Sequence, residues 1–204
     1  KTQCIRKGTE VKIPWQDVQV GDILKVYRGQ EFPADLVFLA AGAQDDWQTA
    51  LCHVQTAQLD GETNLKIRKA PDATVSKFRN DSDCSKFQGV VRCEEPTEHF
   101  GRFTATMFDP DAEAGSTSSA LSADNTLLRG CVLRNVDYVY GLVVYTGEQT
   151  KVRVKQQTGR PTKRGSIESV VNRNLALLVL MLLGNCFVGA SGNFPVNDIL
   201  GALK

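Results

Sequence analysis

The chain opens with short apolar runs that alternate with polar residues and are separated by glycine or proline. The segments VKIPW (11–15), ILKVY (23–27) and DLVFLAAG (35–42) have this form, and valine, isoleucine, leucine and tyrosine dominate them. Alternation with a period of two, bounded by Gly or Pro, is typical of β-strands joined by tight turns. The pattern therefore predicts a β-rich beginning, which the run ALCHVQTAQL (50–59) continues.

The middle of the chain returns to strand patterns after a polar interval at 71–87, which indicates a loop or a short helix. The segment DPDAEAGSTSSA (109–120) is rich in small and acidic residues and has no apolar periodicity, so it predicts a surface loop. Strands are predicted in four further segments: QGVVRCEE (88–95), RFTATMF (102–108), TLLRGCVLRN (126–135) and DYVYGLVVYTG (137–147).

After Lys151 the chain becomes basic and polar and then turns into an apolar run, LALLVLMLLGNCFVGA (175–190), with a helix-start signal at Ser166. The run has no polar face at helical spacing, and it follows a cluster of Lys and Arg, as expected at the cytoplasmic end of a membrane helix. It is shorter than the roughly 20 residues that span a bilayer, so a buried core helix is the alternative. We predict a membrane helix over 174–192, followed by a polar tail at 193–204.

Charge and cysteine content narrow the function classes. A formal net charge of +1 argues against a nucleic-acid-binding module, because phosphate backbones select basic faces. Between Lys151 and Arg173 there are seven basic residues and one acid; such a stretch is a solvated face or, beside a membrane helix, a contact for anionic headgroups. The six cysteines form no C-x-x-C pair, which indicates reduced thiols in the cytosol rather than a zinc or redox site.

One stretch carries candidate chemistry. QLDGETNLKIRKA (58–70) places two acids, Asp60 and Glu62, around Gly61, between an apolar run and a basic one. Taken alone, Asp-Gly is the commonest hairpin-turn signal, because glycine accepts positive φ and the Asp side chain bonds back to the local backbone. The letters alone therefore favour a structural turn.

The surrounding segments change that interpretation, because in their order they resemble the actuator domain of P-type ATPases. VGDILKVYRGQEFPADLVFLA (20–40) precedes DGETN, and DGET between CHVQTAQL and NLKIRKA looks like the P4 subfamily, the phospholipid flippases. FQGVVRCEEP, FTATMF, NTLLRGCVLRNVDYVYGLVVYTGEQTK (125–151) and KRGSIESVVNR agree with it. The resemblance implies a mainly β, distorted jelly-roll-like actuator domain with a few short helices over 1–160. A basic juxtamembrane linker or helix would follow at 161–173.

The resemblance also implies roles for four residues. In P-type ATPases an aspartyl phosphate forms on another cytoplasmic domain, and the actuator loop then reaches it. Glu62 would assist hydrolysis, since a carboxylate can orient the attacking water and take its proton. Gly61 would let the backbone approach the phosphate without a Cβ, Thr63 would offer its hydroxyl and N–H to phosphate oxygens, and Asp60 would fix the turn. Because Glu62 repels a phosphate, it would act only when domain motion presses the loop into place.

The resemblance implies that the full-length protein is an ATP-driven, multi-pass membrane protein with its actuator domain in the cytosol. It would move phospholipid from the exoplasmic to the cytoplasmic leaflet. Mg²⁺ and ATP would be bound outside this chain, which contains neither DKTGT nor a G-K-[ST] phosphate loop. We therefore expect the chain alone to be inactive. Its expected partners are the phosphorylation and nucleotide-binding domains of the same protein and membrane phospholipid, with an accessory subunit as in many flippases.

Two alternatives remain open: a P-type ATPase that moves another substrate, such as an ion, and a non-enzymatic β-domain anchored at a membrane. The tripeptide Thr146-Gly147-Glu148 has the sequence TGE, with which the actuator motif of the ion pumps begins. Its surroundings, however, resemble the exit of a late flippase strand. We therefore assign hydrolysis to Glu62. Asp22 and Asp35 precede strands and are expected to make local hydrogen bonds, and His53 is expected to be structural rather than a metal ligand.

Overall fold

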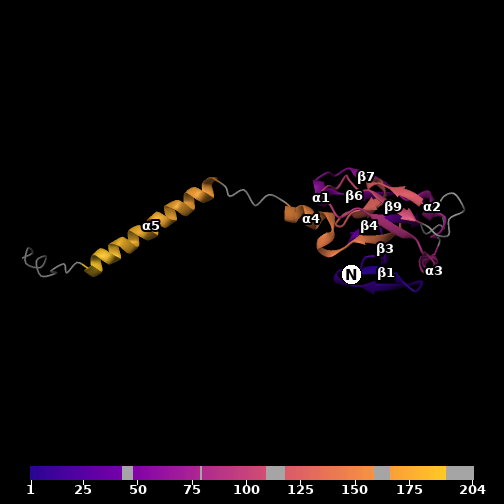
Figure 1. Ribbon diagram of the computed structural model, residues 1–204, viewed down its shortest axis with the longest axis horizontal. Helices are drawn as coiled ribbons and strands as arrows, with labels where there is room; N and C mark the ends of the chain where they lie inside the picture. Colours follow the sequence, from indigo (N-terminus) through magenta and orange to yellow (C-terminus); the bar gives the residue numbers. More distant parts are fainter. Residues whose placement is uncertain (43–47, 79, 109–117, 159–165, 192–204) are drawn as a thin grey trace, which may run out of the picture. The chain divides into compact units, whose positions relative to one another are not determined.

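The computed structural model describes residues 1–42, 48–78, 80–108, 118–158 and 166–191. They belong to two units, Lys1–Gly159 and Arg160–Lys204. Every described strand lies in the first unit, whereas the described part of the second is one helix, α5 (Ser166–Ser191) (Figure 1). The predicted helix start at Ser166 is confirmed.

The largest sheet of the first unit has seven strands in the order β11-β4-β13-β3-β1-β2, with β5 paired to β4, and all of its pairs are antiparallel. Two three-stranded antiparallel sheets accompany it, β12-β6-β7 and β10-β9-β8. The strands are β1 (Thr2–Arg6), β2 (Thr9–Ile13), β3 (Ile23–Tyr27), β4 (Asp35–Gly42), β5 (Gln48–Thr49), β6 (Leu51–Gln55), β7 (Leu65–Lys69), β8 (Val90–Cys93), β9 (Ala105–Phe108), β10 (Ser118–Leu121), β11 (Thr126–Leu127), β12 (Val132–Arg134) and β13 (Tyr138–Tyr145).

Strand β4 explains how the sheets are layered. All eight of its residues are buried, and successive side chains of a strand point to opposite faces. Leu36 and Phe38 belong to one core cluster, with Val54 of β6 and Leu133 of β12. Val37 and Leu39 belong to the other, with Met107 of β9 and Leu121 of β10. The central sheet is therefore covered by one small sheet on each face.

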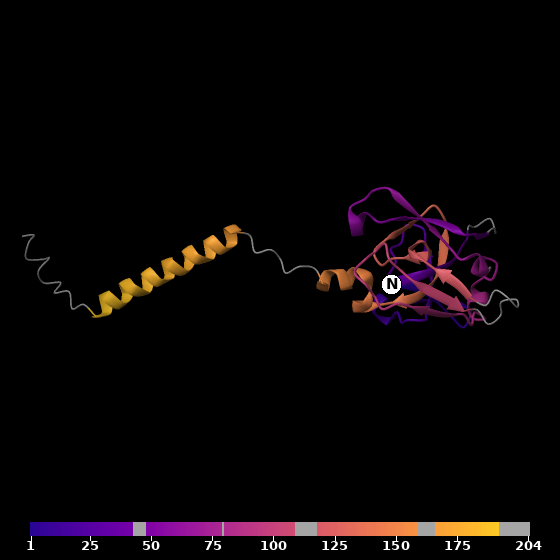
Figure 2. The ribbon, with the colours of Figure 1, turned by 45° about the horizontal axis from the view of Figure 1, so that its top comes forward.

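The expected mainly β, distorted jelly-roll-like architecture with a few short helices is confirmed. The helices are α1 (Ala57–Asp60), α2 (Asp72–Val75), α3 (Asp81–Cys84) and α4 (Lys151–Thr158), with 3₁₀ turns η1 (Trp15–Asp17), η2 (Ala123–Asn125) and η3 (Gly147–Gln149). In Figure 1 the β6–β7 ribbon lies on the opposite side of the first unit from β1. Figure 2 shows the same ribbon, in purple, at the periphery of the unit.

The strand predicted over 126–135 is divided by a turn at 129–130 into β11 and β12, which belong to different sheets. Two further local predictions are wrong. The strand predicted over 50–59 ends at Gln55, and the next residues form the helical turn α1. The predicted loop at 109–120 ends earlier, because Ser118 begins β10, which pairs with β9; residues 109–117 lie outside the described residues. In both cases the tertiary partner decides: β6 has a partner strand on each side only as far as Gln55, and β10 gains one in β9.

The expectation of local hydrogen bonds holds for Asp22 but not for Asp35. Asp22 accepts from the N–H of Gln19, three residues away, at 3.0 Å. Asp35 is 2% exposed and accepts from two distant backbone groups, the N–H of Arg129 at 2.8 Å and that of Lys151 at 2.7 Å. Burial raises the pKa of the Asp35 carboxyl, although the two backbone hydrogen bonds oppose the shift. Asp35 thus joins β4 to the start of α4.

Lys151 also departs from its predicted place on a solvated basic face. It is 1% exposed, and its Nζ donates to the Arg102 carbonyl at 2.6 Å, to Thr97 Oγ1 at 3.2 Å and to the His99 carbonyl at 3.3 Å. Burial lowers the pKa of its ammonium group. A buried charge is tolerated where polar groups satisfy it, so Lys151 belongs to the folded unit.

The second unit contains α5, whose stretch Val170–Gly189 is 20 residues long and, by length and composition, able to cross a membrane. A helix that is apolar all round belongs in a membrane or in a large core, and the length and composition of α5 agree with the predicted membrane helix.

Replacing Asp35 by Asn should destabilise the first unit. Asn offers one acceptor oxygen where the carboxylate offers two, so one buried N–H, of Arg129 or Lys151, would lose its partner, at a cost of about 1–3 kcal/mol. Urea unfolding of residues 1–159 measures the loss. Asp17→Asn at the exposed 3₁₀ turn η1 is the control and should change the free energy of unfolding by less than about 0.5 kcal/mol. Equal stability of the two variants would contradict this role for Asp35.

Candidate functional site

The DGET loop, Asp60–Thr63, connects β6 to β7 through the single helical turn α1. Gly61 ends this turn in the left-handed conformation, with φ of 75°, and its N–H donates to the Ala57 carbonyl at 3.1 Å. A glycine at this position is the usual end of a helix, because a Cβ is disfavoured at positive φ. The Asp-Gly pair therefore ends a helical turn and is not the hairpin turn that its letters suggest. Among the residues that the structure describes, Gly61 and its two chain neighbours aside, no heavy atom lies within 4 Å of where a Cβ on Gly61 would be, so the backbone is open to an approaching group.

Asp60 fixes the loop. One carboxylate oxygen accepts from the backbone N–H of Glu62 at 3.0 Å. The hydroxyl of Thr56 donates to the carboxylate at 3.0 Å, and Lys66 Nζ lies 2.6 Å from Oδ2. The hydrogen bond from Lys66 is the main cause that lowers the pKa of Asp60 below its ordinary value of 3.8. Thr56 is itself buried, so Asp60 ties the loop to the body of the unit.

Glu62 presents its carboxylate at the surface. Its side chain is 60% exposed, and Oε2 lies 3.1 Å from Lys66 Nζ. Its N–H is held by Asp60, so the backbone is fixed while the side chain faces outward. Thr63 follows and is also exposed. A carboxylate arranged in this way can act on a chemical group that another domain or molecule brings to the loop.

Lys66 is the member of the site that the sequence did not reveal. Its ammonium bridges Asp60 and Glu62, and these two carboxylates raise its pKa. The feature of the sequence that could have indicated this contact is the position of Lys66 four residues after Glu62, in the basic run. Spacing of that kind brings side chains together within a helix. Here the contact depends instead on the turn between α1 and β7, which the letters do not predict.

Strand β7 is inverted relative to ordinary amphipathic strands. Its apolar residues Leu65 and Ile67 are 48% and 57% exposed, whereas Lys66 and Arg68 alternate with them and are partly buried. In register, Lys66 lies opposite the buried Val54 and Arg68 opposite the buried Cys52, so the basic side chains share the inner face of the ribbon.

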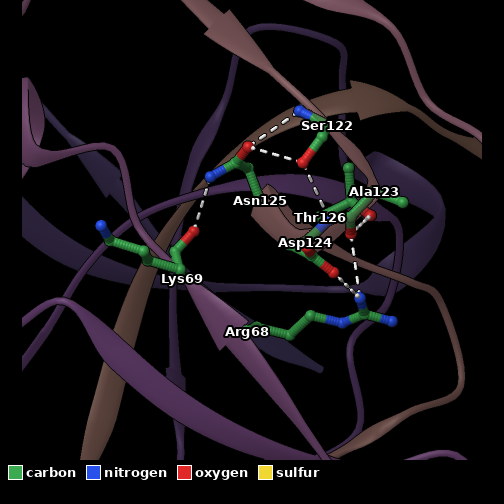
Figure 3. Close-up of polar contacts among 7 residues, drawn as sticks. All are labelled: Arg68, Lys69, Ser122, Ala123, Asp124, Asn125 and Thr126. Carbon is green, nitrogen blue, oxygen red and sulfur yellow. Dashed lines mark hydrogen bonds and ion pairs between the residues drawn. The ribbon is translucent and has the colours of Figure 1, made fainter.

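The inward Arg68 anchors this inverted strand to the turn η2. Its guanidinium donates to the Ala123 carbonyl at 3.0 Å and lies 3.6 Å from Asp124 Oδ1. The side-chain amide of Asn125 donates to the Lys69 carbonyl at 2.8 Å (Figure 3). Ser122 and Asn125 cap η2 reciprocally, which makes the turn a fixed support. The strand that follows the DGET loop is therefore held at both of its inward basic residues, Lys66 and Arg68.

The other candidates lie apart from this cluster in the chain and have structural contacts. Glu148, the acid of the TGE tripeptide, lies in η3, where Gln157 donates to it at 2.9 Å and Arg153 lies 3.7 Å away. His53 lies on β6 with its Nδ1 3.0 Å from the side-chain amide of Asn135. Both contacts tie together neighbouring elements of the fold.

The Asp60 carboxylate can be followed through the Glu62 amide proton, to which it is hydrogen-bonded. Because Lys66 lowers the pKa of Asp60, this ion pair stabilises the fold above pH 3.8 and loses its effect as the pH falls through the lower folded pKa. In an NMR titration the Glu62 amide should shift with a midpoint below 3.8. Lys66→Met should raise that midpoint, and Lys69→Met, whose ammonium pairs with Asp72, should leave it in place. A midpoint insensitive to Lys66→Met would contradict the assignment.

Comparison with known proteins connects this geometry to a family. The family model described as the P-type ATPase actuator domain matches residues 1–171. Probable phospholipid-transporting ATPase 12 of Arabidopsis thaliana is 39% identical over 176 residues, which are 86% of this chain and 14% of the relative. Mouse phospholipid-transporting ATPase FetA is 38% identical over 187 residues, 91% of this chain and 15% of the relative.

Human phospholipid-transporting ATPase IC is 34% identical over 181 residues, which are 89% of this chain and 14% of that protein. The similarity thus extends over most of the chain. The chain itself spans only about one seventh of the length of these curated relatives.

Proposed function

This chain belongs to the P-type ATPase actuator-domain family, with phospholipid-transporting ATPases among its relatives, and on that premise we propose that its DGET loop promotes hydrolysis of an aspartyl phosphate. The whole protein would be an ATP-driven transporter that moves phospholipid from the exoplasmic to the cytoplasmic leaflet. The single observation that carries the proposal is the exposed Glu62 carboxylate on a backbone fixed by Asp60.

The proposed chemistry needs little more than a placed carboxylate. An acyl phosphate is hydrolysed by one water that attacks in line with the leaving carboxylate. Glu62, at hydrogen-bond distance from that water, would orient it and accept its proton. Gly61 leaves the backbone open to the phosphate. The hydroxyl and N–H of Thr63 would then donate to the phosphate oxygens.

Electrostatic repulsion would control when this loop approaches the phosphate. The Glu62 carboxylate and the phosphate are both anionic and repel each other more strongly as water leaves the gap between them. The loop would therefore approach only when movement of the domains presses it into place, which couples hydrolysis to the transport cycle. This coupling would keep the intermediate intact until the lipid step.

The proposed partner of the loop is the phosphorylation domain of the same protein. The exposed Leu65 and Ile67, directly after the loop, support a surface that another part of the protein covers. The nucleotide-binding domain, membrane phospholipid and an accessory subunit complete the proposed partners.

The family implies Mg²⁺ and ATP, but the described residues do not fit a bound Mg²⁺. Within the ranges that the structure describes, no three His, Cys, Asp or Glu side chains lie close enough to hold a metal ion. The DGET loop itself carries two carboxylates that already share the ammonium of Lys66. We therefore propose that other domains of the protein bind Mg²⁺, and that ATP binds there with it.

We propose the following organisation for the chain: an actuator domain over 1–160, a basic linker over 161–173, a membrane helix over 174–192 and a polar tail over 193–204. The length and composition of Val170–Gly189 support the membrane helix. The alternative of an ion-transporting P-type ATPase is disfavoured by DGET in place of TGES and by the relatives, which are phospholipid-transporting ATPases.

Glu62→Gln in the full-length protein should accumulate the aspartyl phosphate and abolish lipid transport. Gln cannot accept the water proton, and loss of a general base slows such a step by about 100-fold or more. The measurement is decay of phosphoenzyme formed with radiolabelled ATP and chased with unlabelled ATP. Glu148→Gln makes the same change in the TGE tripeptide and should leave the decay unchanged. Normal decay in Glu62→Gln would remove Glu62 from the mechanism.

Leu180→Asp should reduce membrane insertion of α5. An Asp at the centre of a membrane helix costs about 2.5–3.5 kcal/mol on the insertion scale, and Leu180 lies near the middle of Val170–Gly189. Glycosylation of reporter sites on either side of α5 in microsomes measures the inserted fraction, with Leu180→Ala as the control. If the unaltered α5 fails to insert, the membrane assignment is wrong.

A further inference from the structure

We propose that Lys66 is a positioning residue that aims and holds the Glu62 carboxylate, an inference that rests on the proposed role of Glu62 in hydrolysis. Lys66 Nζ lies 2.6 Å from Asp60 Oδ2 and 3.1 Å from Glu62 Oε2, so one ammonium bridges both carboxylates of the loop. Among the charged contacts described in the structure, this is the one that fixes the Glu62 side chain rather than its backbone.

The support behind this bridge begins in the interior of the domain. Thr56 is 2% exposed, and its hydroxyl donates to Asp60. Asp60 in turn anchors the Lys66 ammonium, and Lys66 extends from β7 opposite the buried Val54. Glu62 is therefore connected to the core through Lys66, Asp60 and Thr56. A reacting group needs such support, because its geometry is only as fixed as the residues that hold it.

The inversion of β7 argues that this placement of Lys66 serves the loop. A strand on a hydrophobic core ordinarily turns its apolar residues inward, yet here Ile67 is outward and 57% exposed while Lys66 lies on the inner face. Desolvating an ammonium group opposes that choice. The compensation is the pair of carboxylates, whose hydrogen bonds with the ammonium raise the pKa of Lys66.

The bridge has two consequences for a loop that must meet a phosphate. First, it restricts the rotamers of a side chain that is otherwise 60% exposed, so less conformational freedom is lost when the loop docks. Second, it offsets one of the two negative charges that Asp60 and Glu62 bring toward the phosphate. Both effects apply to hydrolysis of the aspartyl phosphate and not to its formation from ATP.

The test uses Lys66→Met in the full-length protein, reconstituted in vesicles of phosphatidylcholine and phosphatidylserine. Phosphoenzyme should form normally from radiolabelled ATP, which also reports an intact fold, and its decay should slow by about tenfold, the loss of one charge-assisted hydrogen bond. Lys66→Arg keeps the charge and should restore most of the rate. Lys69→Met removes an ammonium from the same strand without touching Glu62 and should decay normally.

The double variant Glu62→Gln/Lys66→Met separates positioning from a general structural role. If Lys66 acts through Glu62, the double variant should decay no more slowly than Glu62→Gln alone. A further tenfold slowing in the double variant would show that Lys66 acts independently, and would overturn the inference. No rescue by Lys66→Arg would overturn it as well.

The outcomes also separate this inference from the proposed function. Normal decay in Glu62→Gln defeats the proposed function itself. Blocked decay in Glu62→Gln with normal decay in Lys66→Met defeats only the positioning role. If Lys66→Met forms no phosphoenzyme, Lys66→Gln, which keeps a polar side chain without the charge, is judged by the same decay and rescue criteria.

Discussion

The structure depends on the burial of β4 on both faces. A strand with eight buried residues needs apolar partners above and below the sheet, and Leu36 and Val37 illustrate how neighbouring residues supply opposite cores. Each fully buried Leu or Phe side chain contributes about 1.5–3 kcal/mol, so two-sided covering is a strong constraint. It requires a small sheet on each face, and the one formed by β12, β6 and β7 carries the DGET loop.

The loop thus belongs to a sheet whose inner face both packs on the core and holds basic side chains. Strand β6 contributes apolar residues such as Val54 to the core, while β7 contributes Lys66 and Arg68. The two inward basic residues make polar contacts near the two ends of the strand, Lys66 with the loop carboxylates and Arg68 with η2. The ribbon obtains rigidity from polar contacts where a typical strand obtains it from apolar packing.

The backbone of Glu62 is therefore fixed, while its side chain is exposed to solvent. Within the proposed function, that is the state appropriate to a residue whose phosphate arrives from another domain. The rigid part, from Thr56 to Asp60, sets where the carboxylate is, and the motion of the whole unit would set when it acts. The buried Asp35 and Lys151 serve the same end at α4, because they fix to the folded core the point from which the chain continues toward α5.

Much of the fold could be predicted from the sequence. Alternation and turn residues predicted most strands, the apolar run predicted α5, and the order of several segments identified the family and the loop that contains Glu62. These features are local, and their physical causes, pleat, helix period and the freedom of glycine, act over a few residues.

The packing of the sheets, and not the sequence pattern, sets which polar residues are buried and which groups they contact. Asp35 was expected to bond locally and instead joins segments 94 and 116 residues away, and Lys151 was expected in solvent and is buried. The inversion of β7, and with it the role proposed for Lys66, was equally hidden. The reason is that a polar side chain is buried only where distant groups satisfy it, and the identity of those groups is set by the packing of the sheets and not by neighbours in the chain.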